Sequence, residues 1–440
     1  MNNHSTPITS LISECAIIAF FLVISFLPFG ADIFKLLCLL TMIGCWIARM
    51  ICEQKILFAK TSVNIPILLF FLLSIIASFH SINTHYSFQT LLHDQFVYFI
   101  VFFCMVNTIQ SQGQIKRIVK VMLITCGLVC AYGLFAYYTG IPVRSKRLVA
   151  TFGYYSRIAK YISLLLPIVV CLFFWYKDTL IRLSLAFLVF LCGFCLILTI
   201  NRTSWVAIFV TMLFIGFAIQ KKFLIYTFIC ACALLLLILP SEFITQAKTI
   251  VQVNKYFKSE RSLGDRLLCW KVSIAMIKEH PLLGRGLGKK IFREAYQQYG
   301  EKIKNTEKQL KNEVHSEQPN EIEDKKENNA EKLERLSTAH NIILHMLVET
   351  GIVGLLAFLW LFTNVFYAAI KSWRTSKVGY EKMLLLGITA SLISIFSHGL
   401  TDSFWKKPDA LFLWYIIGIL FAVIHNKRDQ LKTATHVSLN

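Results

Sequence analysis

The chain has 440 residues, of which 56% are hydrophobic and only 16% are charged, and its formal net charge is +20. Soluble globular domains have about a quarter charged residues, so this composition excludes an ordinary soluble domain. Several apolar runs reach the ~18 residues of a membrane helix. We therefore predict an all-α polytopic membrane protein. The basic excess is typical of cytoplasmic loops, and no basic stripe with interleaved aromatic residues indicates nucleic acid as a partner.

About twelve membrane helices are predicted, because apolar runs alternate with short polar loops along the whole chain. The first run is interpreted as a retained helix rather than a signal peptide, since no cationic segment precedes it. The predicted spans are residues 11–29, 33–52, 64–80, 89–108, 118–139, 157–177, 181–200, 204–219, 223–240, 342–370, 382–398 and 408–425.

The short loops predict the orientation of these spans. If the N-terminus is cytoplasmic, every cytoplasmic loop contains Lys or Arg, as the positive-inside rule expects. These cations are Lys55, Lys60, Lys116, Arg117, Lys177, Arg182, Lys221, Lys222, Lys371, Arg374, Lys377, Lys427, Arg428 and Lys432. Both termini are then cytoplasmic. The chain divides into nine spans (1–240), one long outer loop (241–341), and three spans with a cytoplasmic tail (342–440).

The long outer loop has two predicted parts. Its first part, about 260–290, contains an amphipathic helix that ends before Pro281 and lies on the membrane surface or on the helix bundle. The apolar residues that recur at helical spacing are Leu267, Trp270, Ile274 and Ile277. The second part, 301–336, is dense in both charge signs and poor in apolar residues, so it is predicted to be solvated helix or disordered chain.

Neither a cofactor nor a metal is predicted. The motif GRGLG at Gly284–Gly288 follows a helix and a proline rather than a strand, which favours a turn over a dinucleotide-binding loop. His340 and His345 would lie about 140° apart on a helix, and the HExxH pattern is absent. The 13 cysteines lie almost all in apolar runs without a CxxC pattern, so they are interpreted as small apolar residues.

Cations on the outer face are the strongest sign of a ligand, because they oppose the positive-inside preference. They are Arg144, Lys146, Arg147, Arg157, Arg202, Arg266, Lys406 and Lys407. Headgroup snorkelling is sufficient for the two lysines at 406 and 407. The arginines favour an anionic ligand, and the planar fork of Arg202 at a membrane edge suits a diphosphate. Arg266 is a candidate second clamp from the loop.

His340 and Glu349 are the ionisable residues where the tenth span begins. His340 follows Ser337 and Thr338, which are good helix N-caps, and a neutral imidazole in that place can accept a proton. Taken alone, an inert surface histidine remains an alternative. Glu349 is costly inside an apolar run and is expected to face the protein interior, where it orients the helix or its partners. Asn341, with His345 and Glu349, shares one helix face.

Several segments resemble motifs of a known enzyme family in their order and predicted topology. They are SLGDRLLCWKVSIAMIKEHPLLGRGLG around Arg266, AHNIILHMLVETGIVGLLAFL after Ala339, LTINRTSW around Arg202, SHGLTDSFW around Asp402, and RLVATFGYYSRIAKYI from Arg147. The last departs from the pattern, since Tyr154 and Tyr155 stand where the family has Asn-Pro. Over residues 144–405 the chain resembles the O-antigen ligase and O-antigen polymerase superfamily.

This resemblance implies a glycosyltransferase with a GT-C-like fold that needs no metal or nucleotide sugar. It implies transfer, with inversion, of a glycan from undecaprenyl diphosphate to lipid A-core oligosaccharide at the periplasmic face of the bacterial inner membrane. The matching catalytic positions are His340, Arg202 and Arg266. The segments around Arg147 and Asp402 match less well, and the expected substrate-binding residues are Arg144, Arg147, Arg157, Asn341, Glu349 and Asp402.

Other functions remain open at this stage. An O-antigen polymerase uses the same donor and a lipid-linked glycan as acceptor, although one long outer loop favours the ligase. A protein O-oligosaccharyltransferase differs in its acceptor. A non-enzymatic lipid or glycan transporter predicts inverted repeats and charges near the bilayer midplane, neither of which the sequence shows.

Overall fold

The computed structural model describes residues 15, 32–54, 58–140, 147–220, 261–296, 298–299, 338–406 and 408–438. Every regular element in these ranges is helical, as predicted, and none is a strand. The longer helices are α2 (Asp32–Glu53), α3 (Asn64–Phe79), α4 (Thr84–Thr90), α5 (Val97–Thr108), α6 (Gln112–Thr139), α7 (Tyr155–Trp175), α8 (Thr179–Leu198), α9 (Arg202–Ala218), α13 (Arg261–Glu279), α16 (Ile342–Thr375), α17 (Tyr380–Gly399) and α18 (Asp409–Ser438). A π-helical turn, Leu91–Phe96, joins α4 to α5.

Seven of the described helices are long and apolar enough to cross a membrane. They are Thr84–Thr108, Gln112–Thr139, Tyr155–Trp175, Thr179–Leu198, Ile342–Thr375, Tyr380–Gly399 and Asp409–Lys427, and α3 and α9 are shorter apolar helices. The chain is therefore a multi-pass membrane protein in its architecture. Helices also form at the predicted spans 33–52, 64–80 and 204–219. The predicted spans 11–29 and 223–240 lie outside the described residues, so the count of twelve stays a prediction.

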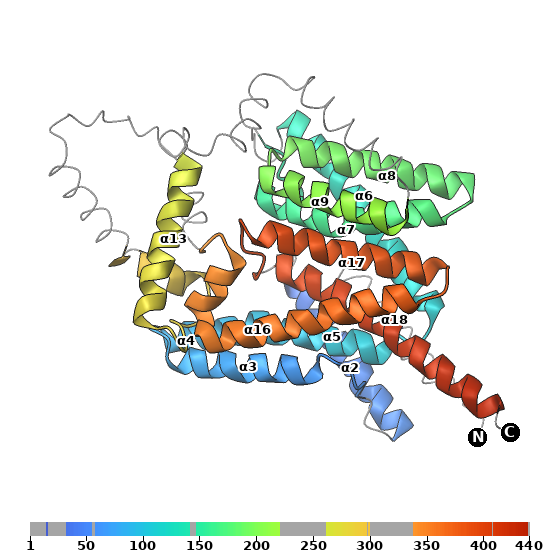
Figure 1. The fold of residues 1–440 in the computed structure, drawn as a ribbon, viewed down its shortest axis with the longest axis horizontal. Coiled ribbons are helices and arrows are strands. Elements are labelled where there is room, and N and C mark those ends of the chain that lie inside the picture. The colour runs from blue at the N-terminus through green and yellow to red at the C-terminus, as the bar shows by residue number, and fades with distance from the viewer. Residues whose placement is uncertain are drawn as a thin grey trace.

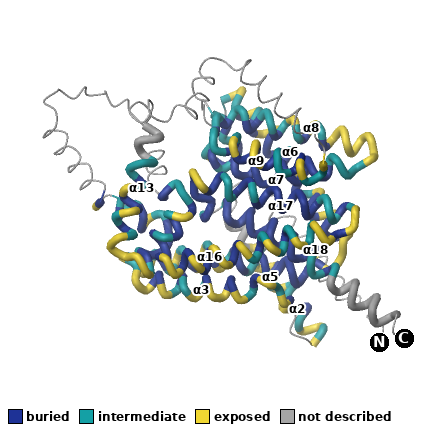
Figure 2. The backbone as a smooth tube through the Cα atoms, viewed as in Figure 1, coloured by how far each residue is buried: buried dark blue, intermediate teal, exposed yellow. Residues whose placement is uncertain are grey.

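The membrane helices pack as a bundle around α7, α17 and α18 (Figure 1). Helix α17 packs on α7, α9 and α16, while α18 packs on α5 and α16 packs on α3. Figure 2 shows the result as a gradient of burial, with α7, α17 and α18 mostly buried and the outward sides of α3 and α8 exposed. Apolar side chains exposed in this way suit a lipid environment, where they need no partner helix.

Helix α13 lies across one end of the bundle rather than along it (Figure 1). A helix forms where the amphipathic helix was predicted, but its buried face is different. Cys269, Val272 and Met276 are fully buried and pack beside Val348 of α16, whereas Ile274 is 46% exposed. The apolar residues of α13 are spread over several faces of the helix. The spacing of these residues therefore did not identify the face that contacts α16.

Helix α16 is broken at Gly351, whose φ of 66° and ψ of −169° are not helical. This backbone region is open almost only to glycine. The turn after α13 supplies the missing hydrogen bonds. Ile352 N donates to Pro281 O at 2.8 Å, while Arg285 N donates to Val348 O at 2.7 Å and Gly286 N donates to Glu349 O at 3.1 Å.

The turn predicted at Gly284–Gly288 therefore forms, and it is built into the start of α16. A Cβ added at Gly284 would overlap the backbone of Glu349, and one added at Gly351 would overlap the carbonyl of Leu282. In a lipid environment an interrupted helix is tolerated only where protein groups satisfy its freed backbone atoms. The hydrogen bonds between the turn and the helix provide those partners, so α13, the turn and the first part of α16 form one unit.

Candidate active site

His340 lies directly before the helix that it was predicted to begin. Asn341 is the N-cap of α16, because its side-chain oxygen accepts hydrogen bonds from Ile343 N and Leu344 N at 2.9 and 3.0 Å. Its side-chain nitrogen donates to Leu400 O at 2.9 Å. The predicted capping by Thr338 is therefore wrong, and Ser337 lies outside the described residues. Asn341 instead ties the start of α16 to the segment that follows α17.

The backbone of His340 has a left-handed conformation, with φ of 49°. Residues other than glycine rarely adopt it, and such outliers concentrate at functional sites. The side chain is 12% exposed, and Nδ1 lies 3.3 Å from Oδ1 of Asp402. A carboxylate at Nδ1 favours the tautomer with hydrogen on that nitrogen. Nε2 then bears the lone pair and can accept a proton.

Asp402 is the centre of a buried polar cluster, which consists of Ser156, Lys160, His340, His398, Asp402 and Asp409. Its Oδ2 accepts a hydrogen bond from Ser156 Oγ at 2.7 Å and lies 3.2 Å from Lys160 Nζ. His398 Nε2 is 3.7 Å from the same oxygen. The carboxylate therefore has positive or donor groups on two helices, α7 and α17, and is held in one orientation toward His340.

Lys160 is the cation at the base of this cluster, and its side chain is only 2% exposed. Its ammonium donates to Asp409 Oδ2 at 2.7 Å and to Ser403 O at 3.0 Å. A buried lysine requires such partners, because an unpaired charge in the membrane interior is costly. It joins α7 to the segment between α17 and α18 and to the first residue of α18.

The electrostatics of the cluster keep Asp402 ionised. Burial by itself would raise the pKa of this carboxyl, but the Lys160 ammonium and the hydrogen bonds with His340 and His398 outweigh burial and hold the pKa well below its ordinary value. An ionised Asp402 is the form that stabilises a protonated imidazole. A proton taken up by His340 would therefore be stabilised by its neighbour.

Arg202 begins α9 beside the same cluster. The next two residues in the chain, Thr203 and Ser204, connect this helix start to the segment around α17. Thr401 Oγ1 donates to Thr203 Oγ1 at 3.0 Å, and Ser204 Oγ lies 3.0 Å from His398 Nδ1. The structure thus brings the start of α9, the segment after α17 and the residues before α16 together at one end of the bundle. The guanidinium of Arg202 is partly exposed there.

The other predicted arginines are more dispersed. Arg147 stacks on the ring of Tyr155, with its guanidinium carbon 4.4 Å from the ring centroid. Arg157 is the neighbour of Ser156, which binds Asp402. Arg266 is partly exposed on α13, and no described contact joins its side chain to His340 or Asp402. Arg144 lies outside the described residues.

Glu349 lies in a different position from His340 and has a structural partner. Its Oε1 accepts a hydrogen bond from Gly288 N at 2.8 Å and is 3.4 Å from His345 Nε2. The carboxylate thus fixes the glycine turn against α16, in agreement with the orienting role expected for it. It does not contact the polar cluster in the described part of the chain.

A polar cavity of about 160 Å³ lies next to Glu349, bounded by α16, the glycine turn, the helix from Thr84 and the segment around Trp405. Five of its lining residues have a buried polar atom without a hydrogen-bond partner among the described residues. These atoms are Gln95 Oε1, Tyr98 OH, Thr338 Oγ1, His345 Nδ1 and Trp405 Nε1. Buried polar groups are normally satisfied, so the cavity is suited to water or to the hydroxyls of a ligand.

Three cysteines form the only described group with metal-ligating atoms close together. The Sγ atoms of Cys126, Cys130 and Cys192 lie within 4.8 Å of one another between α6 and α8. Sequence spacing did not reveal them, because 62 and 66 residues separate Cys192 from the other two. All three are buried in the bundle and contact none of the polar cluster, so we assign them no role in the site.

Residues 187–359 match the family model described as O-antigen ligase. Over this segment, which is less than half of its length, the chain is similar to the O-antigen ligase family. The match includes Arg202, Arg266, His340 and Glu349 but ends before Asp402, so the structure extends the site beyond the matched segment. No curated protein matches the chain.

This similarity supports a glycosyltransferase-like enzyme, and the seven apolar helices support its place in a membrane. The family implies a lipid-linked glycan as donor and a lipid A-core as acceptor in general terms. Sequence reasoning missed Ser156, Lys160, His398 and Asp409 in the site. A lysine within an apolar span was the available signal, since such a charge normally faces the interior and has a partner.

Proposed function

We propose that this protein is an O-antigen ligase that transfers a glycan from undecaprenyl diphosphate to lipid A-core oligosaccharide, at the periplasmic face of the inner membrane. The contact between His340 and Asp402, in a chain similar to this family, is the observation that carries the proposal. It pairs a partly exposed imidazole with a buried, ionised carboxylate, which is the arrangement of a general base.

The proposed reaction is an inverting displacement at the anomeric carbon of the donor sugar. The acceptor hydroxyl oxygen forms the new bond to this carbon, and its proton passes to Nε2 of His340. The bond between the anomeric carbon and the diphosphate oxygen breaks at the same time, and undecaprenyl diphosphate leaves with the electron pair. Asp402 stabilises the imidazolium that forms, and a later proton transfer to water returns His340 to its neutral state.

Negative charge grows on the diphosphate as it leaves, and the proposal assigns its stabilisation to Arg202 and Arg266. A guanidinium provides two parallel hydrogen bonds to phosphate oxygens. Arg202 is favourably placed, because the start of α9 is joined to the His340 cluster through Ser204 and Thr203. Arg266 lies on α13, which packs on α16. In the proposed complex it binds the diphosphate of a donor that lies between α13 and the His340 cluster.

Replacement of His340 tests the general base. The variant His340→Ala should lower transfer by ~10²–10⁴-fold, the usual contribution of a well-placed base. The measurement is the lipopolysaccharide gel pattern of a deletion strain that expresses the variant at the same membrane abundance as the wild type. Normal capping of the core by this variant would refute the role of His340.

The same gel separates ligase from polymerase. Loss of a ligase should leave uncapped core together with lipid-linked polymer, whereas loss of a polymerase should leave core that bears a single repeat. A transporter without chemistry would retain its function when His340 is replaced. The buried support behind this histidine favours an enzyme, since transport does not require a carboxylate fixed at Nδ1.

A further inference from the structure

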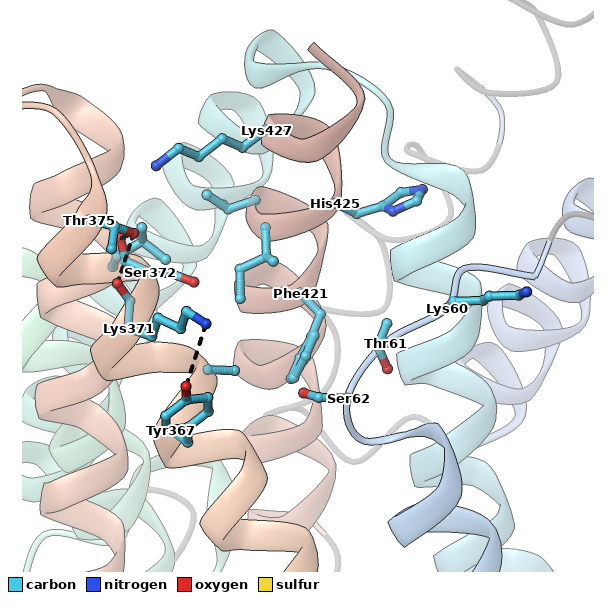
Figure 3. Close-up of a pocket in the computed structure, with 14 residues that line it drawn as sticks. Lys60, Thr61, Ser62, Tyr367, Lys371, Ser372, Thr375, Phe421, His425 and Lys427 are labelled. Atoms are coloured by element: carbon cyan, nitrogen blue, oxygen red, sulfur yellow. Dashed lines mark hydrogen bonds between the residues drawn. The ribbon is translucent and has the colours of Figure 1, made fainter. Parts of the chain in front are cut away.

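A second cavity lies at the opposite end of the bundle from His340. It measures about 240 Å³ and is bounded by the last turns of α16, the middle of α18 and the segment before α3 (Figure 3). Lys371 is 29 residues beyond the start of α16, or about 44 Å along the helix at ~1.5 Å per residue. Because the lipid core is only ~30 Å thick, this cavity belongs to the other membrane face.

The polar lining of this cavity is cationic. Lys371 and Lys427 reach into the space between α16 and α18, whereas Lys60 and His425 lie on the other side of α18 in the same view (Figure 3). None of the 14 described lining residues is Asp or Glu. The cations come from three separate loops that are all predicted to be cytoplasmic, so the fold has gathered them at one place.

The two lysines are held by neutral groups. Lys371 Nζ donates to Tyr367 OH at 3.4 Å, and Lys427 Nζ donates to Ser376 Oγ at 3.2 Å. Among the described residues neither ammonium forms an ion pair with a carboxylate. Both charges therefore remain available to an anion, and hydroxyl groups of Ser372 and Thr375 line the same space.

A third feature of the cavity favours a phosphate ester of a lipid over a small soluble anion. Leu385, Phe421 and Val423 line it together with the lysines, and Tyr367 beside them is 61% exposed. At ~30 Å³ per water molecule the cavity has room for about eight waters. That is larger than a free phosphate needs, and its apolar wall suits the first carbons of acyl chains.

We propose that this cavity, defined by Lys371, Lys427, Ser372, Thr375 and Phe421, binds the headgroup of an anionic phospholipid on the membrane face opposite the candidate active site. The two ammonium groups contact the phosphate, the hydroxyls donate to its oxygens, and the apolar residues contact the glycerol and acyl carbons. Basic pockets between membrane helices on the cytoplasmic side are a recurrent way to bind such lipids. The inference does not depend on the proposed reaction.

The test is native mass spectrometry of the delipidated full-length protein in detergent, titrated with phosphatidylglycerol. The double variant Lys371→Gln/Lys427→Gln should bind this lipid about thirtyfold more weakly, since each lysine beside an anionic lipid contributes about fivefold in affinity. The control is Lys377→Gln, which removes an exposed cation of the same end outside the cavity and should bind within twofold of the wild type.

The variant Lys371→Arg/Lys427→Arg keeps both charges and should bind phosphatidylglycerol within about threefold of the wild type. If it binds as weakly as the glutamine variant, packing rather than charge determines the affinity and the proposal fails. Should the double glutamine variant not fold, the single variants should each show the fivefold loss. Unchanged binding in the glutamine variants would overturn the site.

Two further titrations distinguish the source of the phosphate group. Phosphatidylcholine, which has the phosphate but no net charge, should be retained at least tenfold more weakly than phosphatidylglycerol. Inorganic phosphate at the same concentration should not displace the bound phosphatidylglycerol. Equal retention of the zwitterionic lipid, or displacement by inorganic phosphate, would overturn the assignment to an anionic lipid.

Discussion

Replacing Asp402 by asparagine should separate positioning of His340 from stability of the fold. The carboxylate accepts hydrogen bonds from Ser156 at 2.7 Å and from Ser403 N at 2.9 Å, and it lies 3.3 Å from His340 and 3.2 Å from Lys160. An amide of the same shape has one acceptor oxygen and one NH₂ group. Because donors lie on both sides, either orientation of the amide places NH₂ against a donor.

The stability cost of this change is limited by Asp409. Lys160 keeps its 2.7 Å bond to that carboxylate, so no buried charge becomes unpaired. We expect the free energy of unfolding to fall by ~1.5–3 kcal/mol, the range for one hydrogen bond to a charged group. Transfer should fall by ~10²–10⁴-fold through kcat with little change in KM, because His340 loses the anion that stabilises its protonated form.

The control is Asp409→Asn, which removes the other carboxylate of Lys160 and has no described contact with His340. Its loss of stability should be of the same order, while its kcat should stay within about threefold of the wild type. Purified variants would be compared by thermal unfolding in detergent and by transfer with purified lipid-linked donor. If both variants lose activity equally, Asp402 acts only through folding and the positioning argument is refuted.

Because the pKa of Asp402 is lowered, the stability difference between the wild type and Asp402→Asn should depend on pH. A group whose folded pKa lies below its unfolded value of about 3.9 stabilises the protein above that value. The stabilisation is lost as pH falls through the folded pKa. The difference in unfolding midpoint between wild type and Asp402→Asn should therefore be constant from about pH 5 to pH 8 and should shrink below about pH 4. A difference that disappears near neutral pH would contradict the assigned ionisation.

Three other substitutions test separate parts of the site. Arg202→Lys should lower transfer at least tenfold at normal abundance, since a point charge cannot replace the guanidinium fork, and full activity would exclude a bidentate clamp. Gly351→Ala should lower the unfolding midpoint, because its conformation costs ~1–3 kcal/mol for other residues and its Cβ would overlap Leu282. Gly193→Ala in α8, where an added Cβ would meet no atom within 4 Å, is the comparison, and an equal effect there would contradict the role of the break. Thr338→Val should leave stability unchanged, since its hydroxyl is unpartnered, but should raise KM for one substrate by ~2–10-fold if the cavity binds glycan hydroxyls, and an unchanged KM would argue against that use.

Much of the helical framework was predictable from hydropathy, because an apolar run of about 20 residues has few alternatives to a membrane helix. The predicted spans at 157–177 and 382–398 agree with α7 and α17 to within a few residues. The break at Gly351 was not predictable. Nothing in the local sequence states that the carbonyl of Pro281, 70 residues earlier, will accept a helix hydrogen bond.

In the site, likewise, single unusual residues were predictable from the sequence, whereas the contacts between distant segments were not. His340 stood out because a histidine at the edge of a membrane span is unusual, and Arg202 stood out for the same reason. Their relation to Asp402 depends on which ends of α7, α9, α16 and α17 meet, and no single stretch of sequence encodes that meeting. Lys160 was visible as a charge inside an apolar run, yet its partners 242 and 249 positions later required the structure.

The exchange of hydrogen bonds between the glycine turn and the broken start of α16 has a consequence for synthesis of the chain. The turn at Pro281–Gly286 is made before α16, and in the predicted orientation it crosses to the outer face first. The open N–H groups of Ile352 and Val353 would otherwise meet lipid without an acceptor. The turn must therefore be in place to supply these acceptors when α16 forms. A delay in the translocation of the turn should expose the newly made α16 to degradation.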